Sequence, residues 1–174
     1  KKKKNMAQDL SAAGLFKSDP LLKGVDFERW SKLASDASVE KAKTALAAKT
    51  HKVSVVNSKQ EALELIKATI PKGASVMNAG STTLGEIGFT DYLKTQTEWN
   101  NLHAKVFAEP DPAKSAELRR QALSADYFVS SVCAVTEDGE IVVVDLTGTR
   151  TGAFTHAASH LLIVVGTNKI VSNY

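Results

Sequence analysis

The chain has 174 residues, of which 43% are hydrophobic and 24% charged, as is ordinary for a single globular domain. Its net charge of +3 includes four lysines at residues 1–4; without them 18 basic residues face 19 acidic ones, which leaves −1. This balance argues against nucleic acid as a partner, and the apolar runs are too short for a membrane span or a signal-peptide core, so we expect a cytoplasmic protein that contacts no membrane.

The N-terminal residues 1–25 predict an arm that is poorly ordered or packed at the periphery, because glycines and a proline interrupt it. Residues 26–174 are expected to form one domain, since no linker or internal repeat divides them. Helical spacing covers residues 26–49 with a break near Ser35, and the β-branched run at residues 52–56 predicts the first strand.

A helix and a short strand are expected next. Ser58 and Glu61 have the spacing of a capping box, which predicts a helix that ends at Pro71. The apolar residues 75–77 predict a strand that breaks at Gly80.

The loop after this strand carries four candidate ligand-binding residues, Gly80, Ser81, Thr82 and Thr83. A strand that turns through glycine into a hydroxyl-capped helix start exposes backbone N–H groups, which attract an anion. The alternative is that Ser81 or Thr82 only caps the helix while Gly80 supplies the turn. The loop lacks the Walker lysine and the dinucleotide glycine spacing, so it indicates neither a P-loop nor a Rossmann cofactor.

The second half alternates helices and strands. Predicted helices cover residues 90–97 and 111–123, predicted strands cover residues 102–107, 127–131, 140–145 and 161–165, and a turn at residues 137–139 predicts a hairpin. This alternation predicts an α/β fold with helices on both faces of a mixed, mostly parallel sheet. Ligands of such sheets bind at the carboxyl ends of the strands, which is where the loop at residues 80–83 lies.

Four motifs in one order resemble the lactate-utilisation (LUD) domain family, of the type of bacterial lactate-utilisation protein C. They are GSTTLGEIG at residues 80–88, AVTEDG at 134–139, GTR at 148–150 and VGTNKIV at 165–171. The resemblance covers residues 40–173. It implies a three-layer α/β/α fold similar to glucosamine-phosphate isomerase, ribose-phosphate isomerase and the CoA transferases, in agreement with the α/β pattern.

The resemblance also implies a metabolic role in lactate utilisation, the oxidation of L-lactate to pyruvate by an iron–sulfur-containing system. Several relatives continue past the last motif into a helix and a cysteine cluster, so we expect a short stand-alone member or a domain truncated at its C-terminus. The single cysteine, Cys133, excludes an internal disulfide and an all-cysteine iron–sulfur or zinc site in this chain. We therefore expect no cofactor held by this chain alone.

Two carboxylates are candidate catalytic residues. Glu137 follows Thr136 in a Glu-Asp-Gly context, and class I CoA transferases of similar fold use a glutamate in a Glu-Asn-Gly setting as nucleophile. The resemblance thus makes Glu137 a candidate nucleophile and Thr136 a candidate ligand-binding residue. The alternative for Glu137 is a solvated side chain beside a hairpin turn. Glu86 is the second candidate, either as an acid or base or as a cap for backbone donors.

Two cations are candidate anion-binding residues. Arg150 stands in the glycine-flanked run GTRTG, where the backbone can approach a ligand and the guanidinium can bind a carboxylate or phosphate through two hydrogen bonds. Lys169 is the second candidate, and for both the alternative is a solvated side chain. His156 and His160 are four residues apart, but no third ligand is evident, so we expect no metal site.

The sequence therefore predicts a LUD-like α/β domain that binds a small anion, such as a hydroxy- or keto-acid, a phosphorylated sugar or an acyl-CoA. One alternative is a CoA-transferase-like or sugar-phosphate-isomerase-like enzyme that uses Glu137 or Glu86. The other is a non-catalytic partner subunit of an iron–sulfur oxidoreductase. A homo-oligomer is compatible with each of these hypotheses.

Overall fold

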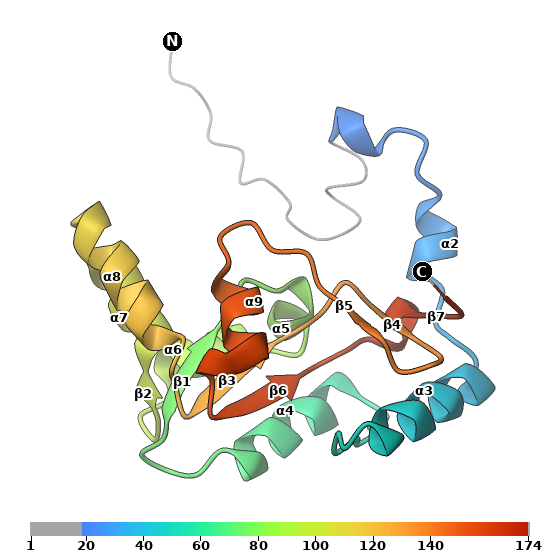
Figure 1. The fold of residues 1–174 in the computed structure, drawn as a ribbon, viewed down its shortest axis with the longest axis horizontal. Helices are drawn as coiled ribbons and strands as arrows, with labels where there is room; N and C mark the ends of the chain where they lie inside the picture. Colours follow the sequence, from blue (N-terminus) through green and yellow to red (C-terminus); the bar gives the residue numbers. More distant parts are fainter. Residues whose placement is uncertain (1–18, 174) are drawn as a thin grey trace.

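A parallel four-stranded sheet forms the centre of the computed structural model, which describes residues 19–173 (Figure 1). In spatial order its strands are β2 (Asn100–Asn101), β1 (Ser75–Asn78), β3 (Tyr127–Ser130) and β6 (His160–Ile163). Every pairing in this sheet is parallel. Helices connect β1 to β2 and β2 to β3, whereas the connection from β3 to β6 also contains two further strands.

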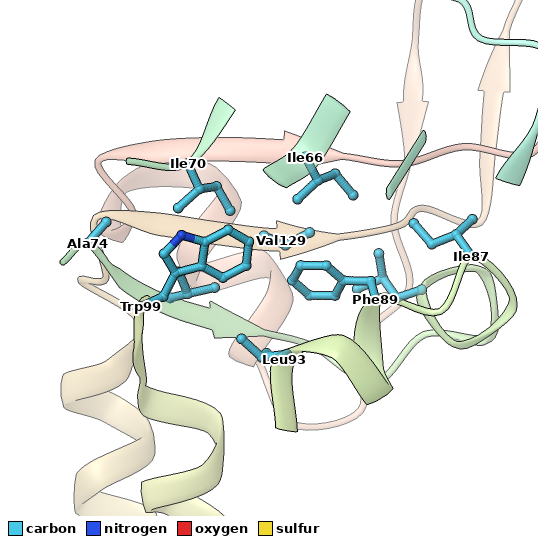
Figure 2. Close-up of a cluster of buried hydrophobic side chains, with 10 residues drawn as sticks. Ile66, Ile70, Ala74, Ile87, Phe89, Leu93, Trp99 and Val129 are labelled. Carbon is cyan, nitrogen blue, oxygen red and sulfur yellow. The ribbon is translucent and has the colours of Figure 1, made fainter. Parts of the chain in front are cut away.

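Alternate residues of the central strands enter opposite faces of the sheet. On one face, Val76 and Val129 pack against side chains of α4 (Lys59–Thr69) and α6 (Phe89–Thr95). Figure 2 shows this cluster, in which Ile66, Ile70, Phe89, Leu93 and Trp99 surround the strand residues.

On the other face, Met77 and Phe128 pack against α7 (Leu102–Ala108), α8 (Pro112–Ala122) and the π-turn η2 (Ala153–Ala157). Val106 and Ala122 are the buried residues of α7 and α8 in this cluster. Both faces of the sheet are therefore covered by helices. The predicted three-layer α/β/α fold with a mostly parallel sheet is confirmed.

A second, smaller sheet makes the fold mixed. Its middle strand β4 (Ala134–Thr136) pairs antiparallel with β5 (Ile141–Val142) and parallel with β7 (Ile170–Val171). The predicted hairpin is thus present, and its turn contains Gly139 with φ +74. A Cβ at this position would lie 2.9 Å from the backbone carbon of Ala45 in α3 (Asp36–Ala48), so the hairpin packs directly on that helix.

The predicted helix starts are present, with caps from the expected residues. Ser58 Oγ accepts a hydrogen bond from the backbone N–H of Glu61 at 3.1 Å. Asp111 caps α8 through the N–H of Ala113 at 2.8 Å, and proline occupies the first helical position. The break expected near Ser35 separates α2 (Phe27–Ser31) from α3.

Two predicted strands are wrong. Residues 102–107 form the helix α7, because Asn101 Oδ1 caps the N–H of Ala104 at 2.9 Å and Leu102 and Val106 recur at helical spacing on the buried side. Residues 52–56 form no regular element and pair with no strand among residues 19–173. Val55 and Val56 stay exposed there, so β-branching alone did not make a strand.

Four short elements remain among residues 19–173. They are η1 (Pro20–Leu22), α5 (Thr82–Glu86), α9 (Thr149–Gly152) and η3 (Thr167–Lys169). Residues 1–18 of the predicted N-terminal arm lie outside the described residues. No helix of the described part is long and apolar enough to cross a membrane.

Candidate functional site

Arg150 lies across the carboxyl ends of β1 and β3. Its Nε donates to Ser130 Oγ at 3.1 Å at the end of β3, and one terminal nitrogen donates to the carbonyl of Gly80 after β1 at 2.8 Å. The other terminal nitrogen donates to the carbonyl of Val144 at 2.8 Å. A guanidinium has more N–H groups than these three bonds use, so Arg150 retains donors for a ligand.

Asp145 fixes the backbone around Arg150. Its Oδ2 accepts from the N–H groups of Arg150 at 2.6 Å and Thr151 at 2.9 Å, at the first turn of α9. Burial raises the pKa of Asp145, but hydrogen bonds from the N–H groups of Thr151, Thr147 and Arg150 outweigh it, so the pKa lies below its usual value. The carboxylate is therefore ionised at neutral pH and engaged with the backbone.

A cavity of about 290 Å³ opens beside Arg150. Gly80, Arg150 and the loop from β5 to α9, the orange segment that arches beside α9 in Figure 1, form one side of it. The side chains of His103 and Phe107 on α7 and Arg119 on α8 also line it.

The three side chains from α7 and α8 are stacked on one another. The rings of His103 and Phe107 are parallel within 27°, with centroids 4.3 Å apart, and the Arg119 guanidinium lies 5.5 Å from the centroid of Phe107. This packing restrains each side chain, and the cation gains from the aromatic face. The cavity thus has a preorganised cationic wall opposite Arg150.

The ionised carboxylate of Asp145 also lines the cavity, but it accepts from backbone N–H groups and pairs with neither the Arg119 nor the Arg150 guanidinium. Among residues 19–173, no carboxylate oxygen lies within 4.0 Å of the guanidinium of Arg119 or Arg150. Burial lowers the pKa of His103, and the charges of Arg119 and Lys94 lower it further. His103 is therefore neutral at pH 7 and offers one N–H donor and one nitrogen acceptor.

Lys169 lies in a separate polar cluster. Its Nζ donates to Thr83 Oγ1 at 3.0 Å, Ser131 Oγ at 3.0 Å and the carbonyl of Val132 at 2.9 Å. An ammonium has three N–H groups, so all are engaged within the protein. Burial lowers the pKa of Lys169 and outweighs the opposing effect of Cys133; the charge of Arg150 lowers the pKa further, and Glu86 opposes it weakly. Lys169 connects α5, the end of β3 and η3.

The other predicted ligand-binding residues have local roles. Ser81 Oγ accepts from the N–H of Leu84 at 3.2 Å and so caps α5, which is the helix-capping role that the sequence offered as the alternative to anion binding. Thr82 is the first residue of that helix. Thr136 is fully buried and bonds the N–H of Glu140 at 3.0 Å, which tightens the hairpin.

The two candidate catalytic carboxylates lie away from the cavity lining. Glu137 pairs with Lys41 of α3 at 3.1 Å and lines a different surface depression; hydrogen bonds from Ser38 and Lys41 hold its pKa below the usual value. Glu86 pairs with Lys59 at 3.5 Å on an exposed surface. Of the residues predicted for the site, the structure brings Gly80 and Arg150 to the same cavity.

His103, Phe107 and Arg119 line the cavity but were not predicted from the sequence. For His103 and Phe107 the reason is the incorrect strand at residues 102–107, in which they would lie about 13 Å apart at about 3.3 Å per residue, whereas one helical turn brings their rings into contact. Their spacing of four residues is a helical signal that could have paired them.

The two histidines considered for a metal do not share a helix. His156 lies in η2, whereas His160 begins β6 and stacks on Tyr127 with ring centroids 4.6 Å apart. In the described part of the chain, no three His, Cys, Asp or Glu side chains come together in a group that could hold a metal ion.

Together, the layers and the cavity define an α/β protein with a cationic pocket at the carboxyl edge of a parallel sheet. The family model of the LUD domain matches residues 39–174, so the chain belongs to the LUD domain family. Comparison with curated proteins gave no match, and comparison with solved structures gave none either.

Proposed function

We propose that this chain takes part in lactate utilisation by binding a small 2-hydroxy- or 2-oxo-acid in the cavity beside Arg150. The association of the LUD family with lactate-utilisation proteins supports the process. The observation that carries the binding proposal is the convergence of Arg119 and Arg150 on a cavity where neither has a carboxylate partner within 4.0 Å among the described residues.

The donors of the cavity suit such an acid. A guanidinium presents paired N–H groups that match the two oxygens of a carboxylate. Neutral His103 can donate to the carbonyl oxygen of pyruvate or accept from the hydroxyl of lactate, because it has one donor and one acceptor. The same lining therefore accommodates both acids.

Thermal unfolding with pyruvate or lactate tests the proposal. At a ligand concentration of about 100 times its dissociation constant we expect a stabilisation of about 2.7 kcal/mol, or on the order of 5–10 °C in Tm. Arg119→Ala should abolish this shift, because Arg119 lines the cavity. Its side chain is partly buried, and it has no ion-pair partner in the described part of the chain.

Lys114→Ala is the matched control, because it removes one positive charge from the exposed surface of the same helix without touching the cavity lining. An equal loss of the ligand-induced shift in both variants would refute binding in this cavity. Arg119→Ala is preferred to Arg150→Ala because Arg150 also connects Ser130, Val144 and Gly80.

A second candidate function, a partner subunit of an oxidoreductase, is favoured by apolar side chains near the cavity. Leu146 and Phe107, both in the lining, are 98% and 64% exposed, and Val144 in the same loop as Leu146 is 68% exposed. Exposed apolar groups of this size are typical of surfaces that contact another protein. The transferase hypothesis on Glu137 stays a prediction, and its pairing with Lys41 does not favour it.

A further inference from the structure

A second cavity adjoins the first. It measures about 460 Å³ and is lined by residues of α8 and by the loop at residues 147–149. Arg119, Thr147 and Thr149 line both cavities, so the two are adjacent and separated only by these side chains. We call the cavity beside Arg150 the inner cavity and the second one the outer cavity.

Lactate and pyruvate are too small to fill the two cavities. Lactate, with three carbons and three oxygens, takes less than about 180 Å³ at about 30 Å³ per atom, the volume of a water molecule in the liquid. The inner cavity alone offers about 290 Å³. A ligand that uses both cavities must extend beyond a three-carbon acid.

The walls of the outer cavity indicate the chemistry of that extension. Arg119 and Arg120 line one wall, and the hydroxyl-bearing Thr147 and Thr149 line the other, with their oxygens 2.8 Å apart. A phosphate monoester suits donors on two walls because it presents three terminal oxygens in a tetrahedral arrangement and more negative charge, whereas a carboxylate presents two oxygens in one plane. The apolar lining by Pro112, Ala116 and Leu123 would contact a short carbon chain.

We propose that the ligand is a phosphorylated carboxylic acid, with its carboxylate at Arg150 in the inner cavity and its phosphate between Arg119 and the 147–149 loop in the outer cavity. This inference rests on the proposed acid-binding function and specifies its ligand class. Arg119 stands at the junction and serves both groups. Arg120, which lines only the outer cavity, adds positive charge near the phosphate, although it forms an ion pair with Glu117, whose Oε2 accepts from its Nε at 3.0 Å and from a terminal nitrogen.

Calorimetric titration at constant ionic strength with glycerate and 3-phosphoglycerate tests the inference. These acids share the hydroxy-acid head and differ in the phosphate. The native chain should bind 3-phosphoglycerate at least about tenfold more tightly than glycerate, since the phosphate adds charge-assisted hydrogen bonds. Arg120→Ala should reduce this gain, with Arg119 still holding the phosphate, and leave the affinity for glycerate unchanged.

Lys114→Ala, an exposed charge change on the same helix, controls for long-range electrostatics. The inference would be overturned by equal affinities for the two acids, or by equal effects of Arg120→Ala and Lys114→Ala on the affinity for 3-phosphoglycerate. In either case, binding of glycerate would still support the proposed function. If neither acid binds, both proposals fail. Arg120→Gln provides a second variant, and the side chain is exposed, so folding should be preserved.

Discussion

At the scale of single residues, three cations that look alike in the sequence have different roles. Arg150 and Arg119 line the cavity, and in the described part of the chain no carboxylate oxygen lies within 4.0 Å of either guanidinium. Lys169 instead donates its three N–H groups to Thr83, Ser131 and Val132. Since burial already disfavours the charge of Lys169, its three acceptors are needed to keep the ammonium in place. These contacts indicate a structural role for Lys169, and its role in ligand binding stays a prediction.

Replacing Lys169 with methionine should destabilise the chain by about 1–3 kcal/mol, because the partly buried acceptors lose their donor. Urea denaturation measures this change, with Lys114→Met as a surface control expected to lie within about 0.5 kcal/mol of the native chain. Pyruvate binding should be retained in Lys169→Met. Equal stability of the two variants, or loss of binding in Lys169→Met alone, would contradict this role.

At the scale of elements, the sequence was sufficient where local signals were strong. The capping box at Ser58, the Asp-Pro start of α8 and the Glu-Asp-Gly turn each identified an element that the structure contains. It failed where tertiary packing decided the element. Residues 102–107 are β-branched or aromatic only at two positions, and the cap from Asn101 together with burial of Val106 made them a helix.

The sequence likewise predicted only part of the candidate site. Gly80 and Arg150 were identified because they lie in glycine-containing loops at strand ends. Arg119 could not be found, since its position opposite Arg150 depends on how α8 packs on α7 and not on any local pattern.

The packing of the hairpin on α3 gives a prediction at this scale. Gly139→Ala should destabilise the chain by about 1–3 kcal/mol, because φ is +74 and a Cβ would lie 2.9 Å from the backbone of Ala45. Gly73→Ala is the matched control, since Gly73 also has a positive φ, +82, but open space around its Cβ position. Chemical denaturation of both variants isolates the contact with α3, and a smaller loss for Gly139→Ala than for Gly73→Ala would contradict it.

At the scale of the whole molecule, the fold explains where the cavity is. The two helical layers pack on opposite faces of the sheet, so the carboxyl ends of β1 and β3 are left open between α7, α8 and the β5–α9 loop (Figure 1). The cationic lining and the exposed Leu146 lie at this same edge. A small acid and a partner protein would therefore compete for, or share, one surface.

The pH dependence of the cavity follows from His103. Its pKa in the folded chain lies below the usual value, so below about pH 6.5 the unfolded chain binds a proton that the folded chain does not. His103 thus makes the folded state less stable as the pH falls through that window. An anion beside Arg119 offsets part of the positive charge, so ligand binding should raise the pKa of His103 again.

NMR titration of the His103 ring with and without pyruvate is the most direct measurement. We expect a pKa below about 6.5 in the free chain and a saturable upward shift with pyruvate, which Arg119→Ala abolishes and Lys114→Ala retains. An unchanged His103 pKa at saturating pyruvate would contradict acid binding in the cavity and favour the partner-subunit function.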